Sequence, residues 1–81
     1  MLNQVVLIGR LCKDPELRYT TGGKAVGGFR LAVDRGTATK ETDFIDVVVW
    51  EKQAETASTH LRKGRLVAVQ GRLQIRQFEH E

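Results

Sequence analysis

The sequence predicts one small β-rich domain with a single helix, spanning residues 1–81. Three observations carry this prediction. Short segments of β-branched and aliphatic residues alternate between two faces, as strands do. One later segment instead repeats small apolar residues at helical spacing. Apolar residues make up 41% of the chain, which is enough for one modest core. A chain of 81 residues is too short for a second domain.

The first strand is expected over Leu2–Leu11, where Gly9 predicts a bulge or a sharp bend. Because the core of so small a domain covers one face of a strand, apolar residues on both faces predict an oligomer interface on the second face. Cover by the domain's own loops is the alternative. The core face would hold Val5, Leu7 and Leu11, and the interface face would hold Leu2, Val6 and Ile8.

Two further extended segments follow. A proline-containing break at Lys13–Glu16 leads into a short extended piece at Leu17–Tyr19, and Thr20–Gly23 predicts a hairpin turn. Ala25–Val33 is the second long strand, and two glycines within it predict curvature or the close approach of another backbone. Asp34–Thr42 is polar and predicts a solvated loop.

The third long strand, Asp43–Trp50, carries the most informative pattern. One of its rows is unbroken and apolar and would face the core, whereas the opposite row holds two aromatic rings on a partly polar surface. A ring with no core to enter needs something else to stack on, although an aromatic residue can also cap the end of a barrel. The core row is Ile45, Val47 and Val49, and the rings are Phe44 and Trp50.

Lys52–Lys63 is the helix candidate, and Gly64 is well placed to end it. The last strand is expected over Arg65–Phe78. Three strands, a helix and a fourth strand are the beginning of a five-stranded Greek-key OB barrel, so the fifth strand is missing and the chain is expected to be truncated at its C-terminus. The expected core rows are Ala54, Ala57, Ser58 and Leu61 on the helix, and Val67, Val69, Gly71, Leu73 and Ile75 on the strand.

Several classes of function are disfavoured. His60 and His80 have no metal-ligand spacing, and Cys12 alone builds neither a disulfide nor a metal site. Asp43 and Asp46 would point to opposite faces of a strand, which makes a poor acid–base pair. We therefore expect no enzyme activity, no metal and no cofactor. Since no apolar run approaches the ~20 residues of a membrane span, we expect a cytoplasmic protein without a membrane partner.

Aromatic and basic residues gather on the outward rows. A net charge of +3 permits an anionic partner without requiring one. Proteins that bind single strands combine rings, on which bases stack, with cations that follow the phosphates. The stacking candidates are Phe44, Trp50 and Phe78. The basic residues of this pattern also include Arg18, Arg30 and Arg72. The candidates selected for phosphate contacts are Lys52, Arg62, Lys63, Arg76, Arg35 and Lys40.

Six motifs occur collinearly over essentially the whole chain: Asn3–Leu11, Asp14–Thr20, Phe29–Arg35, Thr42–Ile45 with Val47–Trp50, Lys52–Glu55 and Leu61–Gly64. Together they resemble the bacterial single-stranded DNA-binding protein family. The resemblance implies an OB fold and a homotetramer built on dimers. It also implies sequence-independent binding of single-stranded DNA in replication, recombination and repair, and hence an association with the nucleoid.

The resemblance further implies roles for particular residues. It assigns base stacking to the three aromatic candidates, DNA contacts to Lys52, Arg62, Lys63 and Arg76, and the dimer interface to the first strand. Replication and repair proteins would be partners only if an acidic tail exists beyond Glu81. The segment Gly36–Thr39 lacks an aromatic residue that some members carry. An RNA-binding OB domain and a truncated OB module that oligomerises with full-length partners remain the alternatives.

Overall fold

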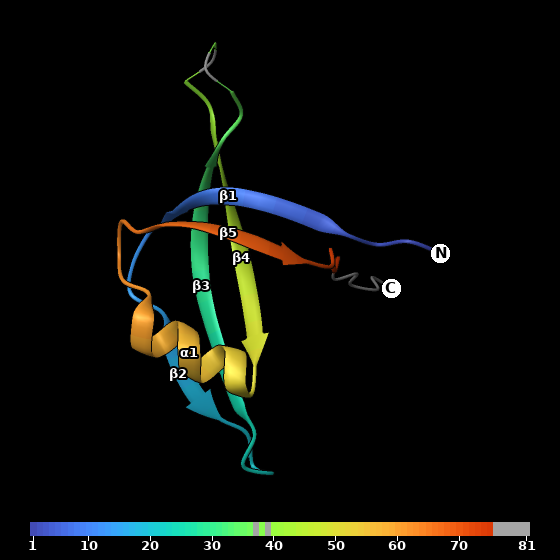
Figure 1. Ribbon diagram of the computed structural model, residues 1–81, viewed down its shortest axis with the longest axis vertical. Coiled ribbons are helices and arrows are strands. Elements are labelled where there is room, and N and C mark those ends of the chain that lie inside the picture. The colour runs from blue at the N-terminus through green and yellow to red at the C-terminus, as the bar shows by residue number, and fades with distance from the viewer. Residues whose placement is uncertain (37, 39, 76–81) are drawn as a thin grey trace, which may run out of the picture.

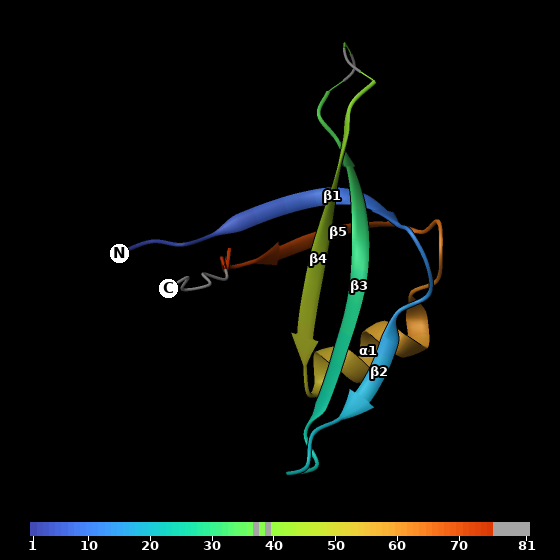
Figure 2. The ribbon, with the colours of Figure 1, turned by 180° about the vertical axis from the view of Figure 1, so that it is seen from behind.

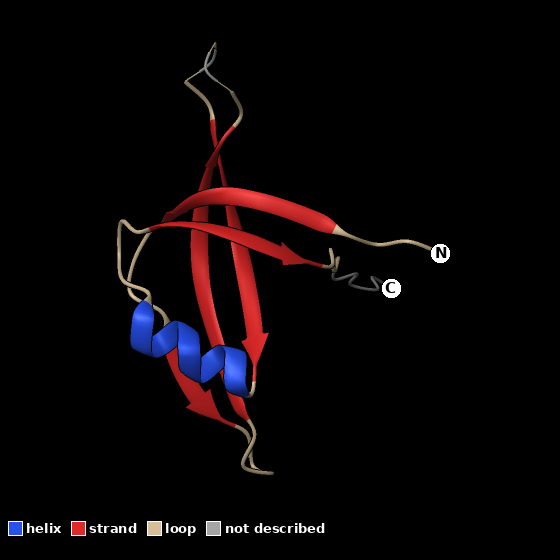
Figure 3. Cartoon of the chain, in the orientation of Figure 1, coloured by secondary structure: helices blue, strands red, loops and turns tan. Residues whose placement is uncertain are grey.

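The computed structural model describes residues 1–36, 38 and 40–75 and contains an antiparallel sheet with one helix (Figures 1 and 3). Strand β3 is central. It pairs with β4 along one edge, and with β1 and β2 along the other, while β5 adds to the far edge of β1. The elements are β1 (Val5–Leu11), β2 (Glu16–Tyr19), β3 (Ala25–Asp34), β4 (Thr42–Trp50), α1 (Lys52–His60) and β5 (Leu66–Gly71).

The sheet is strongly twisted. In Figure 1 the β3–β4 hairpin runs vertically, and β1 and β5 lie side by side across it. Helix α1 covers one face of the sheet near β2 and the first half of β3, and Figure 2 shows the same region from behind, with the strands in front of the helix. The opposite face of β3 and β4 is therefore left uncovered by the helix.

The core lies between α1 and the inward rows of the strands. Its buried residues are Leu11, Phe29, Leu31 and Ala57. The predicted core row of β4 is confirmed, because Val47 and Val49 pack against this cluster and Ile45 is half-buried. Gly27 allows the helix to come close, since a Cβ there would lie 3.2 Å from the Ala54 methyl group.

Gly9 does not form the predicted bulge, and the alternative, a sharp bend, stays a prediction. It pairs in register with Val67 inside β1, and a side chain there would collide with the carbonyl oxygen of Ala32. Glycine is required at this position because β1 crosses the backbone of β3 at very short range. The other prediction for glycine in strands, a close backbone approach in β3, is confirmed at Gly27.

Three predicted boundaries were too wide. Strand β1 begins at Val5, and α1 ends at His60 because Leu61 is already extended at φ −95° and ψ 145°. Strand β5 ends at Gly71, which is opposite Val5, where β1, its one partner among the described residues, also ends.

The predicted core positions after β5 were also wrong. Leu73 is 56% exposed and Ile75 is 78% exposed. The chain at Leu73 is held instead by the side chain of Asn3, whose Nδ2 donates to the Leu73 carbonyl at 2.9 Å and whose Oδ1 accepts from the Leu73 amide at 3.0 Å. A side chain thus replaces the strand pairing that β1 no longer offers.

Within the described part of the chain, the sheet stays open on one side. Among the described residues, β4 pairs with β3 alone and β5 pairs with β1 alone. A hollow of about 670 Å³ separates these two strands and is lined by both apolar and polar side chains, among them Val47, Val49, Val69 and Gln70. The assignment of residues 1–81 to one incomplete domain stays a prediction. Within the described part of the chain, no helix has the length and apolar composition of a membrane span.

Candidate nucleic-acid interface

The two rings of β4 lie on the uncovered side of the sheet. Phe44 is 64% exposed and Trp50 is 52% exposed, whereas the alternate residues of β4 are half-buried. Six residues of an extended strand place the two rings about 20 Å apart. We call the outward row Phe44, Asp46, Val48 and Trp50, with the β3 residues opposite it, the ring face. The alternative, in which Trp50 caps the barrel as peripheral core, does not fit its exposure.

The register of the sheet gives each ring an arginine on the same row. Trp50 is opposite Val26, which is opposite Arg18 on β2. Phe44 is opposite Ala32, which is opposite Arg10 on β1. Directly opposite residues share a face, and two strand spacings are about 10 Å. The Nη1 of Arg10 also donates to the carbonyl of Gly64 at 3.0 Å.

An ion pair lies between the rings. The Nε of Arg30 donates to Oδ1 of Asp46 at 2.9 Å, and its Nη2 donates to Oδ2 at 3.5 Å. Both side chains are exposed, at 54% for Arg30 and 72% for Asp46. The hydrogen bond and the charge of the guanidinium lower the pKa of Asp46, so the carboxylate is ionised at neutral pH. The ring face thus carries a neutral pair at its centre.

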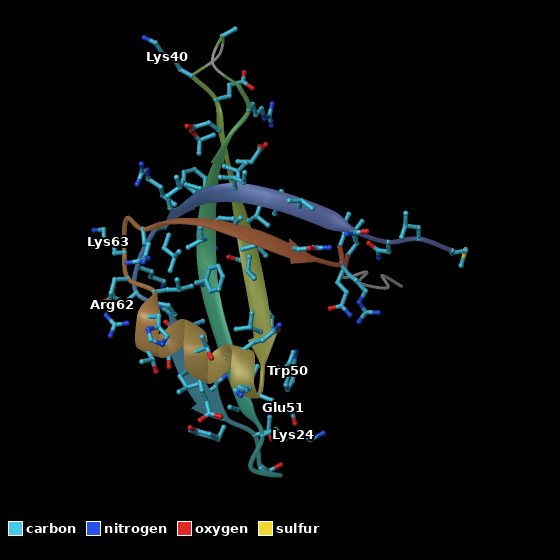
Figure 4. The ribbon with its side chains drawn as sticks, in the orientation of Figure 1. Lys24, Lys40, Trp50, Glu51, Arg62 and Lys63 are labelled. Carbon is cyan, nitrogen blue, oxygen red and sulfur yellow. The ribbon has the colours of Figure 1, made fainter. Side chains whose placement is uncertain are left out.

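The Trp50 end of the ring face is more basic than the strand pattern of the sequence predicts. Lys52 is the first residue of α1 and is exposed, and Lys24 precedes β3 on the row parity of Val26. The amide of Glu51 donates to the carbonyl of Ala25 at 2.7 Å, which brings the Lys24 turn beside the start of the helix (Figure 4). Lys24 and Arg10 were missed, because strand parity alone does not show which strands will be neighbours.

Glu51 is conformationally unusual. Its φ of 55° and ψ of −123° lie in a region that glycine adopts far more readily than other residues. It is the N-cap of α1, yet its side chain makes no capping hydrogen bond. This residue turns the chain abruptly from β4 into the helix, between Trp50 and Lys52.

In the loop between β3 and β4, Arg35, which was predicted to contact phosphate, forms ion pairs with neighbouring residues of the protein. The guanidinium of Arg35 bonds to Asp43 at 2.9 Å and to Glu41 at 2.6 Å. Arg35 in turn lowers the pKa of Asp43, mainly by hydrogen bonding. Lys40 is exposed and lies towards the tip of the hairpin, far from Trp50 (Figure 4). A DNA contact by Arg35 or Lys40 stays a prediction.

Arg62 and Lys63 lie just past the opposite end of α1 from Lys52 and are not brought together with Trp50 (Figure 4). A nine-residue helix separates these ends by about 14 Å. Arg62 also serves the helix, since its Nη1 donates to the carbonyls of Ser58 and Leu61 at 2.7 and 2.6 Å. The remaining candidates, Arg76 and Phe78, lie outside the described residues.

A second outward surface is apolar. We call Leu2, Val6, Ile8 and Leu66 the apolar face. Their exposed fractions are 88%, 63%, 61% and 55%. Leu66 of β5 is opposite Arg10 of β1, so the apolar face borders the ring face within one sheet. The prediction that loops cover this side of β1 does not fit the described residues.

No cluster of three or more histidine, cysteine or acidic residues able to hold a metal ion occurs in the described part of the chain. His60 is exposed on α1, and Cys12 is half-buried without a disulfide. The chemistry of the described surface is therefore that of rings, guanidinium groups, ammonium groups and carboxylates.

Known proteins share this architecture and sequence. The model of the Single-strand binding protein family matches residues 2–81. The single-stranded DNA-binding protein of Bacillus cereus is 53% identical over 98% of this chain and 49% of its own length, and the single-stranded DNA-binding protein A of Bacillus subtilis is 53% identical over 100% and 49%. This chain thus spans about half the length of these relatives.

Solved structures agree with the sequence comparison. The crystal structure of the wild-type single-stranded DNA binding protein from Thermus aquaticus superposes with a TM-score of 0.76 at 48% identity, over 88% of this chain and 32% of that one. A deletion mutant of the same protein gives a TM-score of 0.78 at 46% identity. Both the predicted OB fold and the predicted family are confirmed. The chain belongs to the single-strand binding protein family.

Proposed function

We propose that this protein binds single-stranded DNA without sequence preference, by stacking bases on rings and by pairing phosphates with cations. The observation that carries the proposal is the exposure of Phe44 and Trp50 on one face of β4, with the core row directly behind them. Rings fixed on a strand are rigid, so they lose little conformational freedom when a base stacks on them. The relatives named as single-stranded DNA-binding proteins support the same function.

The phosphate contacts follow the same surface. We propose Lys52 as the contact nearest Trp50, because it is exposed and begins the helix at the end of β4. Arg62 and Lys63 would contact DNA that continues from Trp50 along α1. Lys40 and Arg35 would contact DNA that continues past Phe44. Arg76 and Phe78 are proposed from the sequence alone.

In this role the protein is a binding protein without enzyme activity, which protects single strands during replication, recombination and repair. We further propose that it works as a homo-oligomer, a tetramer built on dimers, in the cytoplasm. Support comes from the apolar face, where Leu2, Val6 and Ile8 are exposed on β1. Water is excluded most readily from such a surface by a second copy of it.

The test is a titration of the full-length natural polypeptide with oligo-dT. Trp50 is the only tryptophan of residues 1–81, and stacking of a base on it should quench its fluorescence. Binding should weaken as salt rises, because phosphate contacts release counterions. Absence of binding at low salt would contradict the proposal. Preference for an RNA oligomer of equal length would favour the RNA-binding alternative, and self-association without any nucleic-acid binding would favour the interaction module.

A further inference from the structure

The centre of the ring face holds a cation whose position follows from the register. Arg30 is opposite Asp46, whereas Ala32 is opposite Phe44 and Gly28 is opposite Val48. Arg30 is therefore the only large β3 side chain on the rows between Phe44 and Trp50. A DNA single strand whose bases stack on both rings, and which takes the shortest path between them, passes over Arg30.

The guanidinium of Arg30 has donors to spare. Asp46 occupies the edge formed by Nε and Nη2, at 2.9 and 3.5 Å. An arginine carries five N–H donors in a fixed planar fork, so three remain after this pair has formed. The side chain is 54% exposed, and no further acceptor for it is recorded among the described residues.

The neighbours of Arg30 leave room for a sugar–phosphate chain. Along β3, Gly28 has no side chain and Ala32 has only a methyl group, so neither blocks access to Arg30. Across the sheet, the exposed Glu16 of β2 is opposite Gly28. Asp46 occupies the Nε–Nη2 edge of the guanidinium, and the side chain as a whole is exposed, so the Nη1 donors are open to a further acceptor. A phosphate oxygen accepts strongly from such donors, because the hydrogen bond is charge-assisted.

We propose that Arg30 is a further phosphate-contact residue, placed midway between the two stacking rings. The inference rests on the proposed function and adds Arg30 to the phosphate-contact candidates, because the sequence counted it among the basic residues but did not select it for a phosphate contact. Asp46 reduces the net charge of this position, so Arg30 contributes at short range through hydrogen bonds more than through the long-range field.

The experiment compares two variants of the full-length natural polypeptide, Asp46→Asn and the double variant Arg30→Gln with Asp46→Asn. Both variants lack the ion pair, and only the single variant Asp46→Asn keeps the positive charge of Arg30. The double variant should bind oligo-dT several-fold more weakly at low salt, and its slope of log K against log salt should be shallower by about 0.7, the value for one phosphate of a single strand. Equal affinities and equal slopes would overturn the proposal.

Two further measurements keep the outcome clear. Arg65→Gln removes one exposed positive charge in the turn before β5 and should change the slope by much less than the Arg30 variant does. If a variant fails to fold, the Nε–H resonance of Arg30 in the parent decides: it should shift on addition of oligo-dT, and a resonance that stays in place while binding saturates would refute the contact. Absence of any oligo-dT binding by the parent would instead contradict the proposed function itself.

Discussion

Two outward surfaces of one sheet differ in what they expose. The apolar face on β1 and β5 shows aliphatic side chains, such as Val6 and Ile8, and the ring face on β3 and β4 shows two rings with an ion pair between them. Aliphatic surface is stabilised by a matching dry surface, whereas rings and cations suit a flat, charged polymer. The proposed contacts between copies would therefore lie mainly on β1 and β5, and the proposed DNA contacts mainly on β3 and β4, with Arg10 of β1 at the border between them.

The largest effect should come from a charge on the apolar face. Ile8→Asp should weaken self-association at least about a hundredfold, because each contact between copies would bury carboxylates without a partner. Sedimentation equilibrium measures this effect. Val48→Asp is the matched control, since Val48 is 57% exposed on the ring face. It should weaken DNA binding and leave self-association as in the parent. If the Ile8→Asp variant self-associates as strongly as the parent, the apolar face is not the contact between copies.

Removal of one ring should have the next largest effect. Trp50→Ala should lower the free energy of oligo-dT binding by about 1–3 kcal/mol, because one stacked base loses its partner. Anisotropy of a labelled oligonucleotide measures the affinity. The melting temperature should stay close to that of the parent, and a large drop would show that Trp50 is core. Tyr19→Ala is the control: Tyr19 is 61% exposed but opposite Ala25, off the ring face, so its loss should leave affinity unchanged.

A smaller effect should come from the residue that ends β4. Glu51→Gly should raise the free energy of unfolding by about 1 kcal/mol. Glycine relieves the strain of the positive φ, and this gain exceeds the entropic cost of ordering a glycine. Urea denaturation measures the free energy of unfolding. Glu55→Gly, at an exposed interior position of α1, should instead destabilise the protein by about 1 kcal/mol. A loss of stability in Glu51→Gly would show that this turn is not strained.

The smallest effect concerns the charges that distinguish the ring face. NMR titration should show the Asp46 carboxyl with a pKa below its ordinary value of 3.8, and Arg30→Gln should return the pKa towards that value. Since the folded-state pKa is depressed, the stabilising contribution is present above the unfolded-state pKa and is lost as pH falls through the folded-state pKa, that is, below about pH 4. Self-association through the apolar face should not follow this titration.

The alternation of residues along each strand was sufficient for part of this description. It separated the core row of β4 from Phe44 and Trp50 and marked both faces of β1 as apolar, because side-chain direction in a strand depends only on local parity. The small-residue stripe of α1 was also readable, and Ala54 and Ala57 are buried as expected.

The strand pairing added what parity does not contain. Pairing partners decide that Arg18 joins the row of Trp50, that Arg10 joins the row of Phe44, and that Arg30 meets Asp46. They also end β5 at Gly71, where β1 stops.

The sequence by itself determined which side chains of β1 and β4 point outward, and through its motifs the family to which the chain belongs. Only the tertiary structure decided which outward side chains become neighbours, since register is a property of two strands and not of one. Phe44 and Trp50 were candidates from their strand alone. The cations on their rows come from β1 and β2, and those between and beside the rings come from β3 and from the turn before it.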